Sequence, residues 1–390
     1  MTTTPARIQV NRFMYFPGDY RWSAALDLVL GSAPFGGSDI GEIDRAGRVL
    51  RDRPGDDDAW FVEWRGLGDR VRNLAVEAEA RGHALTAAAA SLRATSYYQI
   101  GERFRTPKDE AALAAFRAGV SCFHRYAALT DRPRIEVVEV PYLETALPAY
   151  FVHAENTTAA RRPCLVFFDG LDITKELQYL RGVPDLVRRG ISCLVVDGPG
   201  NGESIRFRGL PLRYDYELAG SAAVDYLETR PDVDPGRLGV MGISLGGYYA
   251  ARCAALEPRF KACVSWGAIW DYHATWKRRI EAAFNTSLSV PGHHIAWVFG
   301  VETLDQAMDK LRDFRLDGVV QQMRSAFLLV HGAADEQIPL SDAHALYEAV
   351  GSTNKTLRVF TVEEGGSQHC QSDYVTNGSA TIFDWLQDVL

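Results

Sequence analysis

The sequence predicts an α/β fold, in which a doubly wound and mostly parallel sheet follows a helical N-terminal domain. Two observations predict this class. Through the first third of the chain apolar residues recur at helical spacing, whereas after Pro133 short apolar runs alternate with amphipathic segments. Buried apolar strands that alternate with helices are typical of a parallel sheet with helices on both faces. We therefore expect a helical domain over residues 1–132 and an α/β domain over residues 133–390.

The helical domain is predicted from four segments with apolar residues on one face. They are Tyr20–Ile43, which glycines interrupt, Asp57–Arg81, Leu85–Ile100 and Asp109–Tyr126. Gly82 ends the second segment, since glycine commonly follows the last turn of a helix. We expect the Trp and Tyr residues of these helices to form a packed core between them. The alternative is that some of them line a pocket shared with the second domain.

The α/β domain is predicted to open with an antiparallel pair of strands, Ile135–Val140 and Leu147–Val152, at one edge of the sheet. Six more strands are expected, namely Cys164–Phe168, Ile191–Val196, Leu238–Ile243, Ala262–Trp266, Phe327–Val330 and Leu357–Phe360. Helices are expected between and after them, namely Gln178–Arg189, Tyr216–Thr229, Ser244–Leu256, Leu340–Val350 and Ala380–Val389.

A long insertion at residues 267–324 separates two of these strands. It is rich in aromatic residues at helical spacing, so we expect a helical cap over a pocket. Pockets for small molecules are mostly apolar and aromatic. Trp270 and Tyr272 are therefore candidate substrate contacts. His273, His293 and His294 lie in the same insertion, but no Cys or carboxylate stands at metal-ligand spacing beside them, so we expect no metal site.

Composition excludes several classes of function. The formal net charge of −8 over 390 residues argues against a nucleic-acid-binding protein, which would present a basic face. No apolar run reaches the roughly 18 residues that a membrane helix requires, and the residues after Met1 lack the apolar core of a signal peptide. Six cysteines without a C-x-x-C pair predict buried free thiols. We expect a cytoplasmic protein that contacts neither nucleic acid nor membrane.

The segment Gly239–Tyr248 carries the strongest chemical signal. It reads as an apolar strand, then Gly-x-Ser-x-Gly, then an Ala-rich helix, which is the context of a nucleophile elbow. Ser244 would lie on a tight turn, between two glycines that allow strand and helix to approach closely. The N–H of Leu245 would then face a developing oxyanion. The alternative is an ordinary strand–turn–helix junction that contains a serine.

A serine hydroxyl requires a base, and the base requires an acid that orients it. Asp335 follows the apolar strand Phe327–Val330, and His369 follows the last strand, so the chain order is Ser, Asp, His. The three form the predicted catalytic triad. His331 is the competitor for His369, although it precedes the acid and is expected to be packed. Glu336 competes with Asp335, and Asp335 itself has the alternative role of a helix cap.

The loop Asp169–Glu176, which follows the first parallel strand, is predicted to supply the second oxyanion donor. Its candidates are the N–H groups of Gly170 and Leu171. Asp172 and Glu176 are candidate polar contacts to substrate, and the alternative is that they are acids favoured by a helix N-terminus. A second Gly-rich stretch, Asp197–Ser204, lacks a phosphate-loop lysine and is expected to be a tight loop near the pocket.

These stretches resemble a known family. The catalytic half, residues 135–390, is similar to the α/β-hydrolases. The Phe-Asp-Gly-Leu-Asp-Ile-Thr-Lys-Glu, Asp-Gly-Pro-Gly-Asn-Gly-Glu-Ser and Gly-Ile-Ser-Leu-Gly-Gly-Tyr stretches and the terminal His-Cys-Gln, behind a helical N-terminal domain, resemble a narrower group. That group contains 2,6-dihydroxypseudooxynicotine hydrolase and the fungal yellowish-green-pigment hydrolases that shorten polyketides.

The resemblance implies hydrolysis of a carbon–carbon bond next to a ketone, without metal or cofactor. It implies that Ser244, Asp335 and His369 occupy the triad positions, that a small-molecule substrate is enclosed between helical domain and core, and that the chain forms a homodimer. Related hydrolases cleave esters, lactones or amides, or transfer acyl groups, with the same triad, so these reactions are the first alternative. A non-catalytic binding protein on a hydrolase fold is the second. No dinucleotide fingerprint follows the first parallel strand, which argues against a dehydrogenase.

Overall fold

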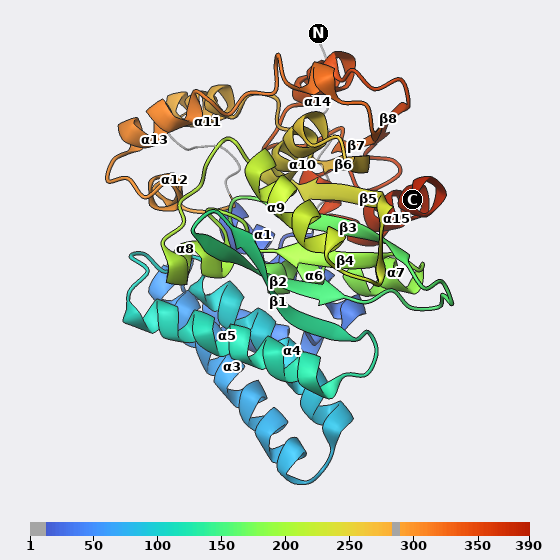
Figure 1. The fold of residues 1–390 in the computed structure, drawn as a ribbon. Helices are drawn as coiled ribbons and strands as arrows, with labels where there is room; N and C mark the ends of the chain where they lie inside the picture. Colours follow the sequence, from blue (N-terminus) through green and yellow to red (C-terminus); the bar gives the residue numbers. More distant parts are fainter. Residues whose placement is uncertain (1–12, 283–288) are drawn as a thin grey trace.

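An eight-stranded sheet forms the centre of the molecule (Figure 1). The computed structural model describes residues 13–282 and 289–390. The strand order is β1-β2-β4-β3-β5-β6-β7-β8. Their bounds are β1 Ile135–Tyr142, β2 Thr145–Val152, β3 Arg162–Phe168, β4 Ser192–Val196, β5 Val233–Ile243, β6 Phe260–Trp266, β7 Ala326–Gly332 and β8 Lys355–Phe360. The pairs β1/β2 and β2/β4 are antiparallel and all other pairs are parallel. The predicted α/β class and its antiparallel edge are confirmed.

Helices cover both faces of the sheet, because its central strands are apolar on both sides. One face packs against α9 (Glu217–Glu228), α10 (Leu245–Leu256) and α14 (Leu340–Ala349). The other packs against α7 (Val183–Arg188) and α15 (Val375–Val389). All six cysteines are buried and unpaired, as predicted.

In the described part of the chain, five α-helices precede the sheet and have a core of their own. Their bounds are α1 Tyr20–Gly31, α2 Ile40–Leu50, α3 Asp57–Ala80, α4 Ala84–Glu102 and α5 Glu110–Leu129. Trp22, Trp60, Trp64, Tyr97 and Tyr98 are fully buried among them, so most of the aromatic residues pack helices together rather than line a pocket. Within the described residues, no helix combines the length and apolarity needed to cross a membrane.

Three predicted segments differ in the structure. The glycine-interrupted segment Tyr20–Ile43 is α1 and the first turn of α2, with a short 3₁₀ turn at Ala33–Phe35 between them. The segment Gln178–Arg189 is two helices, α6 (Lys175–Tyr179) and α7, separated at Gly182. Gly182 has φ +113°, and a Cβ there would lie 2.6 Å from the Phe383 ring, so only glycine fits this turn. The Gly-rich stretch is not wholly a loop, since α8 (Gly202–Arg208) begins inside it. The Asp197 carboxylate accepts a hydrogen bond from the Glu203 N–H at 2.9 Å, which satisfies a first-turn donor of that helix.

The insertion between β6 and β7 contains α11 (Tyr272–Glu281), α12 (His294–Val298) and α13 (Leu304–Leu311), which lie together at one side of the sheet (Figure 1). Phe314 anchors it. The centroid of the Phe314 ring lies 5.4 Å from the ring centroid of Tyr248 on α10 and 6.2 Å from that of Tyr272. Residues 283–288 of the predicted cap lie outside the described residues.

Candidate active site

Ser244 lies at the junction of β5 and α10, in a backbone conformation that side chains rarely adopt. Its φ and ψ are +60° and −119°. Its N–H donates to the Trp266 carbonyl at 2.7 Å, which holds the turn against β6. A Cβ on Gly242 would lie 1.9 Å from the Gly246 carbonyl oxygen. The motif glycines are therefore required by contact, and the strained serine is the geometry of a nucleophile elbow.

The structure brings the three predicted triad residues into one hydrogen-bonded chain. The Ser244 Oγ lies 2.8 Å from the His369 Nε2. The His369 Nδ1 lies 2.6 Å from the Asp335 Oδ2. Residues 125 and 34 positions apart in the sequence are thus aligned in the order that a nucleophile, its base and an orienting acid would require.

Asp335 is fixed by its own loop. Its Oδ1 accepts hydrogen bonds from the N–H groups of Gln337, at 2.8 Å, and Ile338, at 2.9 Å, and its side chain is 1% exposed. Burial opposes the charge on both partners. Their mutual attraction nevertheless holds the pKa of Asp335 below its ordinary value and the pKa of His369 well above its own. The pair is therefore arranged to stabilise an imidazolium beside Ser244.

The two competing residues are not part of this hydrogen-bonded chain, although the His331 Nε2 lies 3.8 Å from the Asp335 Oδ2. His331 is fully buried, with its Nδ1 accepting from the Ala268 N–H at 3.3 Å and its Nε2 3.1 Å from the Ile338 carbonyl oxygen. It is a packed histidine with both ring nitrogens engaged. Glu336 is exposed to solvent.

The loop after β3 lies directly against the elbow. A Cβ on Gly170 would stand 3.0 Å from the Ile243 carbonyl oxygen and 3.1 Å from the Ser244 Cβ. The Gly170 N–H donates to the Asp169 Oδ1 at 2.6 Å and is therefore occupied, which removes it as an oxyanion donor. The Gly170 carbonyl accepts from the Asn201 Nδ2. In a trans peptide the next N–H points the opposite way. The Leu171 N–H thus points away from Asn201.

Leu245 is the first residue of α10, so its N–H has no acceptor within the helix. Together with Leu171 it retains the position predicted for an oxyanion donor. With the Gly170 N–H occupied, the Leu245 and Leu171 N–H groups remain the predicted oxyanion donors.

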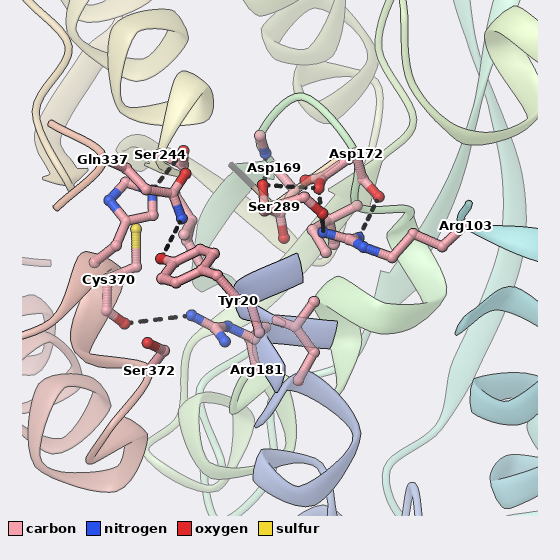
Figure 2. A pocket seen from close by; sticks show the side chains of 16 residues that line it. Tyr20, Arg103, Asp169, Asp172, Arg181, Ser244, Ser289, Gln337, Cys370 and Ser372 are labelled. Atoms are coloured by element: carbon pink, nitrogen blue, oxygen red, sulfur yellow. Dashed lines mark hydrogen bonds and ion pairs between the residues drawn. The ribbon is translucent and has the colours of Figure 1, made fainter. Parts of the chain in front are cut away.

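Ser244 and His369 line a cavity of about 70 Å³, and Figure 2 shows Ser244 among the side chains around it. Its walls come from both parts of the chain. The helices contribute Tyr20, Ala24 and Leu28 of α1 and Arg103 at the end of α4, and the sheet domain contributes loops after its strands. The cavity therefore lies where α1 and the end of α4 meet the loops of the core.

Comparisons with known proteins agree with this geometry. A model of FrsA-like esterases matches residues 48–291, and a model of the prolyl oligopeptidase family matches residues 220–390. The chain belongs to the FrsA-like α/β-hydrolases.

Two curated relatives match this hydrolase almost end to end. The 20-hydroxy-prefusarin hydrolase of Gibberella moniliformis is 30% identical, over 92% of this chain and 94% of its own. The hydrolase acrC of Aspergillus aculeatus is 30% identical, over 96% and 98%. Among solved structures, 2,6-dihydroxy-pseudo-oxynicotine hydrolase superposes with a TM-score of 0.77 at 28% identity, over 93% and 95%. The narrower group inferred from the sequence motifs is confirmed.

Of the four predicted substrate contacts in the hydrolase, only Asp172 lines the cavity. Its carboxylate forms a buried ion pair with Arg103, and the Ser289 Oγ donates to it at 3.3 Å (Figure 2). Arg103 also donates to the Asp172 carbonyl at 3.0 Å. No periodicity or motif marked Arg103, because its role arises from contact between segments 69 residues apart.

Glu176, Trp270 and Tyr272 lie away from the cavity. Glu176 is fully buried, and its carboxylate accepts from Lys175, Tyr150 and Gln99 at 2.8, 2.5 and 2.9 Å. It therefore joins elements rather than faces substrate. Tyr272 is buried in the packing of the insertion, 6.1 Å from the Trp276 ring, and Trp270 packs against the same core cluster.

Sequence reasoning also passed over Asp169 and Arg181, which line the cavity beside the triad. Asp169 stood inside the predicted oxyanion loop, so its position was a usable signal. Arg181 had none, because it belongs to the turn at Gly182 that was predicted to be helical. The described parts of the chain hold no group of three or more His, Cys, Asp and Glu side chains arranged for a metal ion.

Proposed function

We propose that this hydrolase cleaves a carbon–carbon bond next to a ketone, in a polyketide or hydroxylated aromatic substrate, by nucleophilic attack of Ser244. The observation that carries the proposal is the aligned chain from the Ser244 hydroxyl through His369 to Asp335, placed at a strained elbow. The end-to-end similarity to 2,6-dihydroxy-pseudo-oxynicotine hydrolase supports the carbon–carbon bond as the target.

In the proposed reaction His369 takes the Ser244 proton as Oγ attacks the ketone carbon. Asp335 stabilises the imidazolium, which the raised pKa of His369 favours. The Leu245 and Leu171 N–H groups bind the oxyanion, and loss of one such donor costs about 10²–10³ in kcat. Collapse breaks the carbon–carbon bond, and His369 protonates the departing carbon. Water, activated by the same histidine, then releases the acid from Ser244.

The leaving group sets the demand on the substrate. A carbanion leaves only when its charge is delocalised, so the carbon must be flanked by a second carbonyl or by a hydroxylated ring. An ester does not have this requirement, because its leaving group is already an oxygen. The cavity between helices and core encloses the reacting atoms, which strengthens the electrostatic interactions that hold them.

Product analysis by mass spectrometry tests the reaction class. Wild type and Ser244→Ala are each incubated with an aromatic β-diketone and a nitrophenyl ester. We expect wild type to split the diketone into an acid and a shortened ketone, and Ser244→Ala to be inactive on both. Cleavage of the ester alone would assign the hydrolase to the esterases, and equal activity of Ser244→Ala would remove Ser244 from the mechanism.

We also propose that the chain forms a homodimer, because the family resemblance implies one. Light scattering of the purified chain measures its mass directly. A mass of one 43.2 kDa chain would contradict it.

A further inference from the structure

Asp169 is a buried carboxyl group beside the nucleophile. It follows β3 directly, is 5% exposed, and lines the same cavity as Ser244 and His369. In the view of Figure 2 it lies between Ser244 and the Arg103–Asp172 pair. Its Oδ1 accepts from the Gly170 N–H at 2.6 Å. Its Oδ2 is buried and has no hydrogen-bond partner among the described residues.

An unpartnered buried carboxylate oxygen is costly, so it calls for a proton or a ligand. The two nearby guanidinium groups do not supply a partner. Arg103 is paired with Asp172, and Arg181 donates to the Cys370 carbonyl at 3.4 Å. Among the described residues no ion pair involves Asp169. The other titratable side chains that line the cavity among the described residues are those of Tyr20, His369 and Cys370, and Tyr249 of α10 also interacts electrostatically with Asp169.

This setting favours the neutral acid. Burial raises the pKa of Asp169 to about 7, although Arg181 and the Gly170 N–H oppose the shift. A neutral carboxyl has one O–H donor, whereas a carboxylate has none. Enzymes can keep a carboxylic acid neutral in an apolar site so that it donates a hydrogen bond to an enolate oxygen. Ketosteroid isomerase is an example.

We propose that the Asp169 carboxyl donates a hydrogen bond from Oδ2 to the second carbonyl oxygen of a 1,3-dicarbonyl substrate, and that this contact selects the substrate class. The inference rests on the carbon–carbon hydrolysis proposed above. Ester cleavage forms no enolate, so a hydrogen bond from this acid to an enolate oxygen stabilises only the carbon–carbon cleavage.

The step balances without a co-reactant. Ser244 Oγ bonds to one carbonyl carbon of R–CO–CH₂–CO–R′, and His369 receives its proton. When the carbon–carbon bond breaks, its electron pair moves onto the CH₂ carbon and the second carbonyl oxygen, where Asp169 donates. The CH₂ carbon takes the proton from His369 and leaves as CH₃–CO–R′. Water releases RCOOH from Ser244, and Asp169 ends with the proton that it began with.

Two substitutions at one position test this. Asp169→Asn keeps the shape and a donor at the Oδ2 position but cannot ionise, and Asp169→Leu removes the donor. Each variant is assayed on an aromatic β-diketone and on a nitrophenyl ester between pH 6 and pH 9, with a thermal melt to establish folding. We expect Asp169→Leu to lose about 10²–10³-fold on the diketone, as for one oxyanion donor, and to lose clearly less on the ester.

The pH profile separates a substrate contact from a structural role. Because His369 must be neutral and Asp169 protonated, wild type should lose diketone cleavage at alkaline pH, where burial no longer keeps Asp169 protonated, whereas Asp169→Asn should keep a plateau there. Equal losses on both substrates in Asp169→Leu, together with an unchanged pH profile in Asp169→Asn, would overturn the inference, as would unchanged diketone cleavage in Asp169→Leu. A wild type that cleaves only the ester would overturn the proposed function and this inference together, whereas the other failures leave the proposed function standing.

Discussion

At the level of single residues, Asp335 controls the pKa of His369 and therefore the pH range in which His369 can accept the Ser244 proton. The base must be neutral to accept the Ser244 proton. Because Asp335 raises the pKa of His369, activity should be lost as the pH falls through a value above the ordinary histidine pKa of about 6.5. A pH profile of kcat/KM for ester cleavage measures this loss of activity, which forms the acidic limb of the profile.

Asp335→Asn should move that limb to lower pH, because the attraction that raised the pKa is gone while burial still disfavours the cation. We expect kcat to fall by about 10⁴, since the histidine also loses its orienting partner. Glu336→Gln is the control, being the neighbouring acid on the same loop but exposed. A limb that stays in place in Asp335→Asn would contradict the assignment.

Gly242 tests the elbow itself. A Cβ there meets the Gly246 carbonyl oxygen at 1.9 Å, which the backbone can relieve only by opening the turn. Gly242→Ala should therefore destabilise the protein and abolish activity. Gly66→Ala in α3 is the matched change, with its nearest neighbour at 3.5 Å, and should stabilise by about 0.5–1 kcal/mol. Urea unfolding distinguishes them, and a fully active Gly242→Ala variant would argue against a strained elbow.

At the scale of the element, buried charges join segments that the sequence separates. The Lys175 Nζ contacts Glu176, Asp197 and Glu203 at 2.8, 3.1 and 2.6 Å, and Glu176 reaches Gln99 of α4 and Tyr150 of β2. Among the described residues, Lys175 is the only cation paired with these carboxylates, so removing it would leave Glu176 and Asp197 buried without a cationic partner. Lys175→Met should cost about 3–5 kcal/mol.

Lys277→Met is the control for that change, because its partner Glu281 and the lysine itself are both more than 60% exposed. It should alter the free energy of unfolding by less than about 1 kcal/mol. Equal effects of the two substitutions would contradict a structural role for the buried network.

The network also predicts acid sensitivity. Burial opposes the charge on Glu176, but Lys175 lowers the pKa of Glu176 to about 2. The ionised Glu176 therefore stabilises the folded protein fully above the ordinary glutamate pKa, and this stabilisation is lost as the pH falls toward 2.

Local composition was enough to place the strands, because a buried strand is a short apolar run whatever surrounds it. It was also enough to order Ser244, Asp335 and His369, because each follows a strand in a recognisable turn. The break at Gly182 was missed, since it depends on the Phe383 ring from the far end of the chain. Arg103 and the burial of Glu176 were missed for the same reason: each depends on a contact across more than 60 positions.

Across the whole molecule, the proposed substrate pocket is shaped by the N-terminal helices as well as by the core. Ala24 of α1 lines the cavity opposite the loops of the core. Ala24→Phe should narrow the cavity and lower kcat/KM for an aromatic β-diketone by about tenfold or more, because misplacement of the reacting atoms is costly. Cleavage of a short acetate ester should change much less.

The control for this change is Ala33→Phe, which adds the same ring at an exposed position after α1. It should leave both activities near those of wild type. If Ala24→Phe affected the two substrates equally, or neither, the helices would not shape the substrate pocket.

The central claim is that one serine carries the carbon–carbon cleavage, and chemical titration of that serine tests it most directly. The protein is treated with increasing amounts of a fluorophosphonate, the labelled residue is located by peptide mass spectrometry, and diketone cleavage is measured on the same samples. We predict label on Ser244 alone, with activity lost in proportion to the labelled fraction. Label at another residue, or diketone cleavage that survives complete labelling of Ser244, would contradict the account.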